Sequence, residues 1–216
     1  MKVFIVHYIK LVERKKNIIR QLINNNLEAE FVEQYTRNNL STKDTFIFTK
    51  NVNPANMAIS LSHLYCYKEI AEKYDYGLIL EDDAIFDNNF HNNLNKYISQ
   101  LPDDWDMLFL DDCCNFHIPN TNSKQNIYRK NLVANSAGGG MGATRGAGCY
   151  LVSKTCAAKI TYNIQTYYYN GIHKVDDQID FWLNNVFRRN NFNIYWAEPT
   201  ISTQGTQNGR YKTSHT

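Results

Sequence analysis

The chain has 216 residues, of which 43% are hydrophobic and 20% charged, a composition typical of one globular domain. Its formal net charge of +2 is too small to favour a nucleic-acid partner. No apolar run approaches the roughly 18–20 residues of a membrane span, so we expect a soluble protein. Its five cysteines form no C-x-x-C pair, which is typical of reduced cytosolic thiols, and we therefore expect a cytoplasmic location.

Strands and helices alternate in the first half of the chain. Short apolar runs predict strands, and apolar residues at helical spacing predict the helices between them. The expected elements are a strand at 3–6, a helix at 11–23, a strand at 30–33, a loop at 36–52, a helix from 54 to 70, a strand at 78–80, a helix from 87 to 98 and a strand at 105–110. Asn53 and Pro54 are a typical N-cap and first-turn proline for the second helix.

The second half begins with a segment, residues 113–144, that has no apolar period. Its end, Gly138-Gly139-Gly140-Met141-Gly142, predicts a mobile loop, which we expect to order when a ligand binds. The pattern does not match a phosphate-binding glycine loop. Beyond it we expect a strand at 149–152, helices at 153–162 and 179–187, a strand at 192–196 and a polar tail from 203 to 216.

Two acidic clusters follow predicted strands. The alternation of strands and helices predicts an α/β fold with a Rossmann-like, mostly parallel sheet flanked by helices. Ligands of such sheets bind at the carboxyl ends of the strands, which is where Glu81-Asp82-Asp83 and Asp111-Asp112 fall. Consecutive carboxylates repel one another unless a cation neutralises them, and their oxygens suit Mg²⁺ or Mn²⁺. A solvated acidic turn is the alternative interpretation.

The segment Leu78–Ala84 resembles the acidic motif of glycosyltransferase family 25. That family includes lipooligosaccharide galactosyl- and glucosyltransferases and collagen β-galactosyltransferases. Other segments resemble the family in the same order along nearly the whole chain: Glu13-Arg14, Leu61-Ser62-His63, Trp105-Asp106, Gly148 to Ser153, Val175-Asp176-Asp177, and Trp196-Ala197-Glu198-Pro199 with Gln204 and Ser214. The chain departs from the family at His7-Tyr8-Ile9, where Ile-Asn-Leu is common, and residues 112–144 match no family segment.

The resemblance implies a GT-A type fold, a UDP-hexose donor, Mn²⁺ with Mg²⁺ as the alternative, and inversion at the anomeric carbon. The acceptor would be a hydroxyl of a glycan or of a hydroxylysine-type side chain, and the sugar galactose or glucose. The implied metal ligands are Asp83 and Glu81, and the implied base is Asp177 or Asp176. The implied donor-binding residues are Tyr8, Arg14, Ser62, His63, Glu81, Asp82 and Asp112.

We expect one domain over residues 1–216, with the donor side at about 1–112 and the acceptor side at about 113–216. Two other functions use the same residues. A phosphohydrolase would use the carboxylates to hold a metal, although the first strand lacks the following aspartates of haloacid-dehalogenase-like enzymes. A non-catalytic protein that binds a nucleotide sugar would retain the fold without the reaction.

Overall fold

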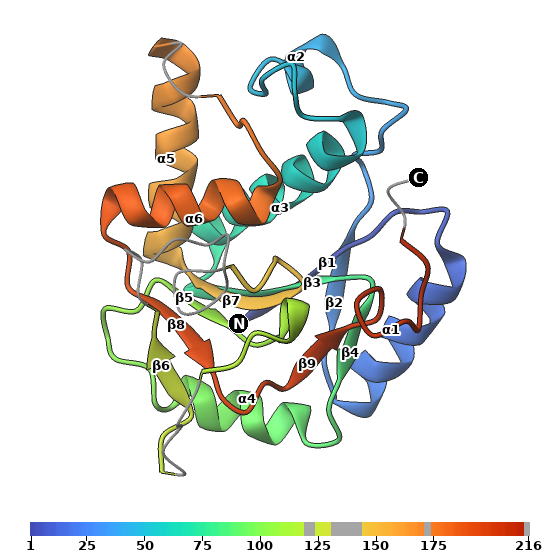
Figure 1. Cartoon of the computed structure of the whole chain (residues 1–216), viewed down its shortest axis with the longest axis vertical. Helices are drawn as coiled ribbons and strands as arrows, with labels where there is room; N and C mark the ends of the chain where they lie inside the picture. Colours follow the sequence, from blue (N-terminus) through green and yellow to red (C-terminus); the bar gives the residue numbers. More distant parts are fainter. Residues whose placement is uncertain (119–123, 131–143, 171–173, 214–216) are drawn as a thin grey trace.

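A seven-stranded sheet forms the centre of the computed structural model, which describes residues 1–118, 124–130, 144–170 and 174–213 (Figure 1). Its strands are β1 (Lys2–Val6), β2 (Ala29–Val32), β3 (Tyr76–Glu81), β5 (Met107–Phe109), β6 (Ile127–Arg129), β7 (Cys149–Ser153) and β8 (Ile194–Ala197). Two further strands, β4 (Ala84–Phe86) and β9 (Ser202–Gln204), lie outside this sheet. The helices are α1 (Val12–Asn24), α2 (Thr42–Thr45), α3 (Pro54–Lys73), α4 (Phe90–Ile98), α5 (Lys154–Asn170) and α6 (Ile179–Asn190), with a 3₁₀ turn at Cys113–Asn115.

The strand order in the central sheet is β2-β1-β3-β7-β5-β8-β6. Strands β2, β1, β3, β5 and β8 run in one direction, and β7 and β6 run in the other. The mostly parallel sheet that the sequence predicts is therefore correct, but β7 lies between β3 and β5 and is antiparallel to both. The ends of β1, β3 and β5 consequently lie at one edge of the sheet, where the site forms.

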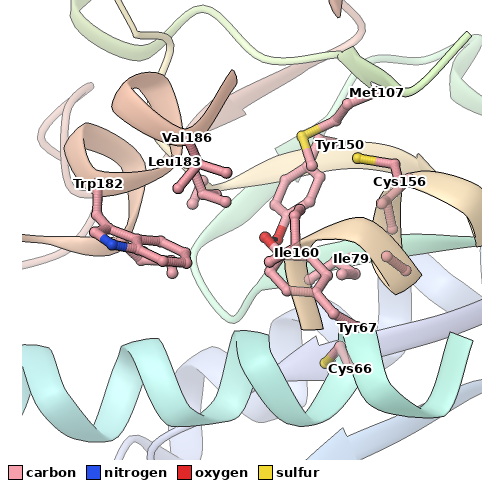
Figure 2. Packing of buried hydrophobic residues seen from close by; sticks show 14 of the residues in the cluster. Cys66, Tyr67, Ile79, Met107, Tyr150, Cys156, Ile160, Trp182, Leu183 and Val186 are labelled. Atoms are coloured by element: carbon pink, nitrogen blue, oxygen red, sulfur yellow. Dashed lines mark hydrogen bonds between the residues drawn. The ribbon is translucent and has the colours of Figure 1, made fainter. Parts of the chain in front are cut away.

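The sheet is buried on both faces. Alternate residues of each strand point to opposite faces, so Phe4 and Ile79 belong to one hydrophobic cluster and Ile5 and Leu78 to the other. Helices α3, α5 and α6 cover the first face, and α1 and α4 cover the second (Figure 1). Figure 2 shows the first cluster, in which side chains of α3, α5 and α6 meet those of the sheet.

Helix α3 begins as the sequence predicts. The side chain of Asn53 accepts a hydrogen bond from the backbone N–H of Asn56 at 2.9 Å, and Pro54 occupies the first turn. In the predicted loop that precedes it, Ser41 and Asp44 form a capping box that starts the short helix α2. Helix α4 begins at Phe90 rather than at 87.

Residues 202–213 begin with a strand and continue in turns, whereas the sequence predicts a polar tail from 203. Strand β9 pairs with β4 in a second, two-stranded sheet, in which Ala84 lies opposite Gln204. After β9, the chain lies against α1, where Arg210 donates to Asn17 at 3.2 Å. Hydrophobic periodicity does not detect this strand because it has only three residues and forms through a long-range partner.

Parts of the predicted acceptor side are outside the described residues. They include the glycine cluster at Gly138–Gly142 and Ser214. None of the helices in the described segments is long and apolar enough to cross a membrane.

Candidate active site

A cavity of about 320 Å³ lies at the carboxyl ends of β1 and β3. Segments that are distant in sequence line it, among them the β1–α1 connection, the start of α3, the turn after β3, the start of α6 and the segment that begins with β9. Its polar lining residues include Tyr8, Arg14, Asn56, Glu81, Asp82, Asp83, Gln178, Asp180, Gln204, Thr206 and Gln207. The structure thus brings together five of the predicted site residues, Tyr8, Arg14, Glu81, Asp82 and Asp83.

Asp82 is held by groups from the end of β1 and from α1. Its Oδ2 is 2.7 Å from Nδ1 of His7 and accepts a bond from the backbone N–H of Tyr8 at 3.3 Å. Its Oδ1 accepts a bond from the guanidinium of Arg14 at 3.0 Å. Because both oxygens are engaged and the residue is only 5% exposed, Asp82 fixes Arg14 and the β1 end at the cavity.

Asp83 has one engaged oxygen and one without a partner among the described residues. Oδ2 accepts bonds from the backbone N–H and the hydroxyl of Thr206, at 3.2 and 2.5 Å, whereas the buried Oδ1 has none. Burial, and secondarily the charge of Glu81, raise the pKa of Asp83 to about 6. A buried carboxylate oxygen that lacks a hydrogen bond is costly, so a ligand that supplies positive charge here is favoured.

Glu81 ends β3 beside Asp83 and is partly exposed to the cavity, with 29% of its side chain accessible. Its Oε1 lies 3.4 Å from Nε2 of His63, a fully buried residue of α3. A residue that contacts the donor directly must line the cavity, and His63 does not. His63 instead contacts Glu81, a carboxylate that does line it.

Asp111 follows β5 and is fully buried beneath the cavity lining. Its Oδ2 accepts a bond from Gln204, which does line the cavity, at 3.1 Å. Burial raises the pKa of Asp111 well above its usual value. A Cβ on Gly148 would lie 2.4 Å from Nε2 of Gln204 and 2.6 Å from the Asp111 carboxylate, so this contact requires a glycine there.

The two predicted bases are not on the cavity lining. Asp176 and Asp177 are exposed, and Asp177 accepts a bond from the backbone N–H of Gln178 at 2.8 Å. The cavity is lined instead by Asp180, in the first turn of α6. Burial raises the pKa of Asp180 to about 6, and the charge of Glu81 adds to the shift.

Two predicted donor-binding residues lie away from the main cavity. Ser62 lines a smaller cavity of about 60 Å³, which shares Tyr8 with the larger one, and its hydroxyl donates to the carbonyl of Ala58 at 3.0 Å. Asp112 lines neither cavity, and its Oδ2 lies 3.9 Å from Nε2 of His117.

Sequence reasoning missed three side chains that face or support the site, namely His7, Thr206 and Asp180. Asp180 lies three residues after Asp177 and in the first turn of α6, and this position next to the predicted bases was the signal in the sequence. Thr206 left no signal in the sequence, because its role depends on the β4–β9 pairing that carries it to Asp83.

Asp83 and Glu81 suit a divalent cation whose remaining coordination positions are filled by a bound ligand. Within the described residues, no three His, Cys, Asp or Glu side chains are grouped to hold a metal ion by themselves. Mg²⁺ and similar ions are commonly bound by one or two carboxylates together with substrate phosphates and water. Asp83, with its unpartnered Oδ1, and the neighbouring Glu81 match that smaller ligand set.

An acidic cavity at the carboxyl end of a mostly parallel sheet is the ligand site of a Rossmann-like α/β protein. The sequence profile of glycosyltransferase family 25 (LPS biosynthesis protein) matches residues 1–179, and the chain belongs to this family. It is therefore a glycosyltransferase. No curated protein matches the sequence.

The solved structures that are similar to the chain include the following two. One is a glycosyltransferase involved in the glycosylation of the major capsid of PBCV-1, with a TM-score of 0.51 and 11% identity, covering 97% of this chain and 96% of the other. This similarity confirms the predicted GT-A type fold. The other is a putative glucose-1-phosphate thymidylyltransferase from Bacillus anthracis, with a TM-score of 0.34 and 9% identity, covering 86% of this chain and 75% of the other.

Proposed function

We propose that the chain is an inverting, metal-dependent glycosyltransferase that moves galactose or glucose from a UDP-sugar to a hydroxyl group. The observation that carries the proposal is Asp83, a buried carboxylate on the cavity lining whose Oδ1 has no partner among the described residues. Asp83 and Glu81 would hold Mn²⁺ or Mg²⁺ together with the donor diphosphate. The ion would supply positive charge to the leaving β-phosphate.

The two adjoining cavities suit the two parts of a nucleotide sugar. The smaller one is lined by Tyr8, Tyr35 and Ser62 among others, and we place the uracil base there. The guanidinium of Arg37 lies 5.6 Å from the centre of the Tyr8 ring, so a positive charge also lies beside the smaller cavity. The diphosphate then reaches the larger cavity, where Arg14 and the acidic turn lie.

Asp180 is the best-placed base in the described part of the cavity. In an inverting displacement, the acceptor oxygen bonds to the anomeric carbon while the bond from that carbon to the UDP oxygen breaks. The acceptor hydroxyl loses its proton to a carboxylate. With a pKa raised to about 6, Asp180 is largely ionised at neutral pH and is more basic than an exposed aspartate.

The acceptor is proposed to be a glycan or a hydroxylysine-type side chain, bound mainly by the second half of the chain. Asp180, Gln204 and Thr206 nevertheless line the same cavity as the acidic turn. The donor side, about residues 1–112, and the acceptor side therefore share this cavity.

The test is release of UDP from a panel of UDP-sugars, with Mn²⁺ or with EDTA, comparing wild type with Asp83→Ala. We expect metal-dependent turnover of UDP-galactose or UDP-glucose and its loss in the variant. Binding of a UDP-sugar without any release, with every candidate acceptor supplied, would identify a non-catalytic binding protein. Release of orthophosphate from phosphomonoesters would instead favour a phosphohydrolase, which family membership argues against.

A further inference from the structure

A chain of hydrogen-bonded side chains runs from the hydrophobic core to the edge of the active-site cavity. The hydroxyls of Tyr67, on α3, and Tyr150, on β7, are 2.6 Å apart, and both residues lie among apolar side chains (Figure 2). The Tyr150 hydroxyl is also 2.7 Å from Nδ1 of His63. The opposite ring nitrogen of His63, Nε2, is 3.4 Å from Oε1 of Glu81.

The inner members of this chain are sealed from solvent. Tyr67, Tyr150 and His63 are each 0% exposed, and the His63 and Tyr150 rings are stacked with their centres 5.8 Å apart. Burial raises the pKa of both tyrosines well above 10, so each hydroxyl keeps its proton. Each hydroxyl consequently has one hydrogen to donate, and that hydrogen needs a protein acceptor.

One arrangement of hydrogens gives every donor an acceptor. Tyr67 donates to Tyr150, Tyr150 donates to Nδ1 of His63, and the Nε2–H of His63 donates to Glu81. In the reverse arrangement, Nδ1–H donates to Tyr150 and Tyr150 donates to Tyr67. The Tyr67 hydrogen then has no acceptor among the described residues, and a bare Nε2 faces the Glu81 carboxylate, which repels it.

We propose that Tyr150 fixes His63 as the Nε2–H tautomer and that His63 thereby positions the Glu81 carboxylate at the cavity. The proposal rests on the proposed function, because it assigns to Glu81 a role in holding the donor. His63 and Tyr150 are positioning residues, since neither of them lines the cavity. Their effect is exerted through one oxygen of Glu81.

The arrangement has a consequence for ligand binding. With Oε1 oriented by His63, the second oxygen of Glu81 remains for the donor or its cation. Glu81 is the most exposed of the three consecutive carboxylates. Its side chain is 29% accessible, whereas Asp82 and Asp83, measured over the whole residue, are 5% and 3% exposed. A flexible glutamate at that position loses side-chain entropy when it binds, and an existing hydrogen bond reduces that loss.

The direct test is the tautomer of His63, measured by ¹⁵N NMR of the histidine side chains in the full chain. Comparison with His63→Gln identifies the His63 signals. We expect a neutral ring that is protonated at Nε2. A ring protonated at Nδ1 alone, or at both nitrogens at neutral pH, would overturn the proposal. This experiment requires no enzymatic activity, so it stands even if no UDP-sugar is turned over.

Matched variants test the positioning effect. Tyr150→Phe removes the hydrogen bond to Nδ1, and we expect the affinity for UDP with Mn²⁺, or the KM for the donor, to worsen by about tenfold, with a smaller change in kcat. Tyr67→Phe removes a hydroxyl from the same cluster but keeps the bond from Tyr150 to His63, and we expect a change within about twofold. Equal effects of the two substitutions would indicate loss of packing alone and would refute a role for the tautomer.

Rescue at His63 separates positioning from folding. Glutamine carries an amide N–H near the place of Nε2, whereas leucine fills the space without a donor. We expect His63→Gln to retain donor affinity within about threefold and His63→Leu to lose about tenfold or more. If the two bind UDP with Mn²⁺ equally well, the hydrogen bond to Glu81 has no positioning role.

Discussion

Asp83 and Thr206 are 123 residues apart in the chain, yet Thr206 donates two hydrogen bonds to one oxygen of Asp83, from its backbone N–H and from its hydroxyl. The pairing of β9 with β4 makes the contact, because it places the residues after Gln204 beside the acidic turn. Both bonds favour the ionised form of Asp83 and oppose the effect of its burial. The C-terminal segment is therefore a part of the candidate active site.

Replacing Thr206 with valine tests this contact. The substitution removes the hydroxyl donor at nearly constant volume, so the pKa of Asp83 is expected to rise further above about 6. Since a proton competes with a cation for Asp83, affinity for UDP with Mn²⁺ near pH 6.5 should fall by about tenfold and recover toward pH 8. Titration calorimetry at several pH values measures this change. Thr203→Val, in the preceding strand β9, is the control; an equal loss there would contradict the assignment.

Asp83 should also make stability depend on pH in the absence of metal. Its pKa in the folded protein, about 6, is above the usual 3.8, so the folded state binds the proton more tightly. This contribution to stability is complete below about pH 4 and is lost as pH rises through 6. Between pH 4 and 7.5, we expect the free energy of unfolding of wild type to fall relative to that of Asp83→Asn by about 2–3 kcal/mol.

Denaturant unfolding with EDTA measures this difference. The exposed substitution Asp103→Asn serves as the control and should not alter the pH dependence. Asp111 and Asp180 are present in both proteins and do not contribute to the comparison. A difference between wild type and Asp83→Asn that is constant across the range would show that Asp83 titrates normally.

The choice of base can be tested by three matched substitutions. Asp180→Asn removes the carboxylate from the cavity and should lower kcat by about 10²–10⁴-fold while donor affinity changes little. Asp177→Asn and Asp176→Asn alter exposed residues and should retain activity within about threefold. Steady-state kinetics with a saturating acceptor makes the measurement. Loss of kcat in Asp177→Asn with an active Asp180→Asn would restore the original sequence-based expectation.

The Arg14–Asp82 pair should be strongly coupled. Both residues are buried, and the guanidinium of Arg14 also donates to the carbonyl of Lys212 at 2.6 Å. Arg14→Met leaves the Asp82 charge with fewer partners, and we expect a loss of about 3–5 kcal/mol in the free energy of unfolding. Adding Asp82→Asn should recover part of that loss.

A double-mutant cycle of urea unfolding gives the coupling energy directly. We expect it to exceed about 1 kcal/mol in magnitude. The exposed pair Lys16–Glu13, with its atoms 2.8 Å apart, is the comparison and should show a coupling near zero. Strict additivity of Arg14→Met and Asp82→Asn would mean that the buried pair does not stabilise the fold.

Much of the fold could be predicted because the signals are local. The apolar runs of β1 and β3, the Asn53-Pro54 start of α3 and the period of α6 each specify an element within a short window. The acidic turn after β3 was likewise predictable, since a parallel strand has its carboxyl end at the ligand edge. The antiparallel direction of β7 was not, because strand direction depends on the connection rather than on the strand's own residues.

The sequence by itself determined the α/β class, the family and the position of Glu81-Asp82-Asp83 at the ligand edge of the sheet, because strand propensity and residue order are local properties of the chain. The tertiary structure decided the different environments of those three carboxylates. It pairs Asp82 with Arg14 and His7, brings Thr206 to one oxygen of Asp83, and connects Glu81 to a buried histidine. Burial and partner charge set the ionisation of a carboxylate, and both arise only when distant segments pack together.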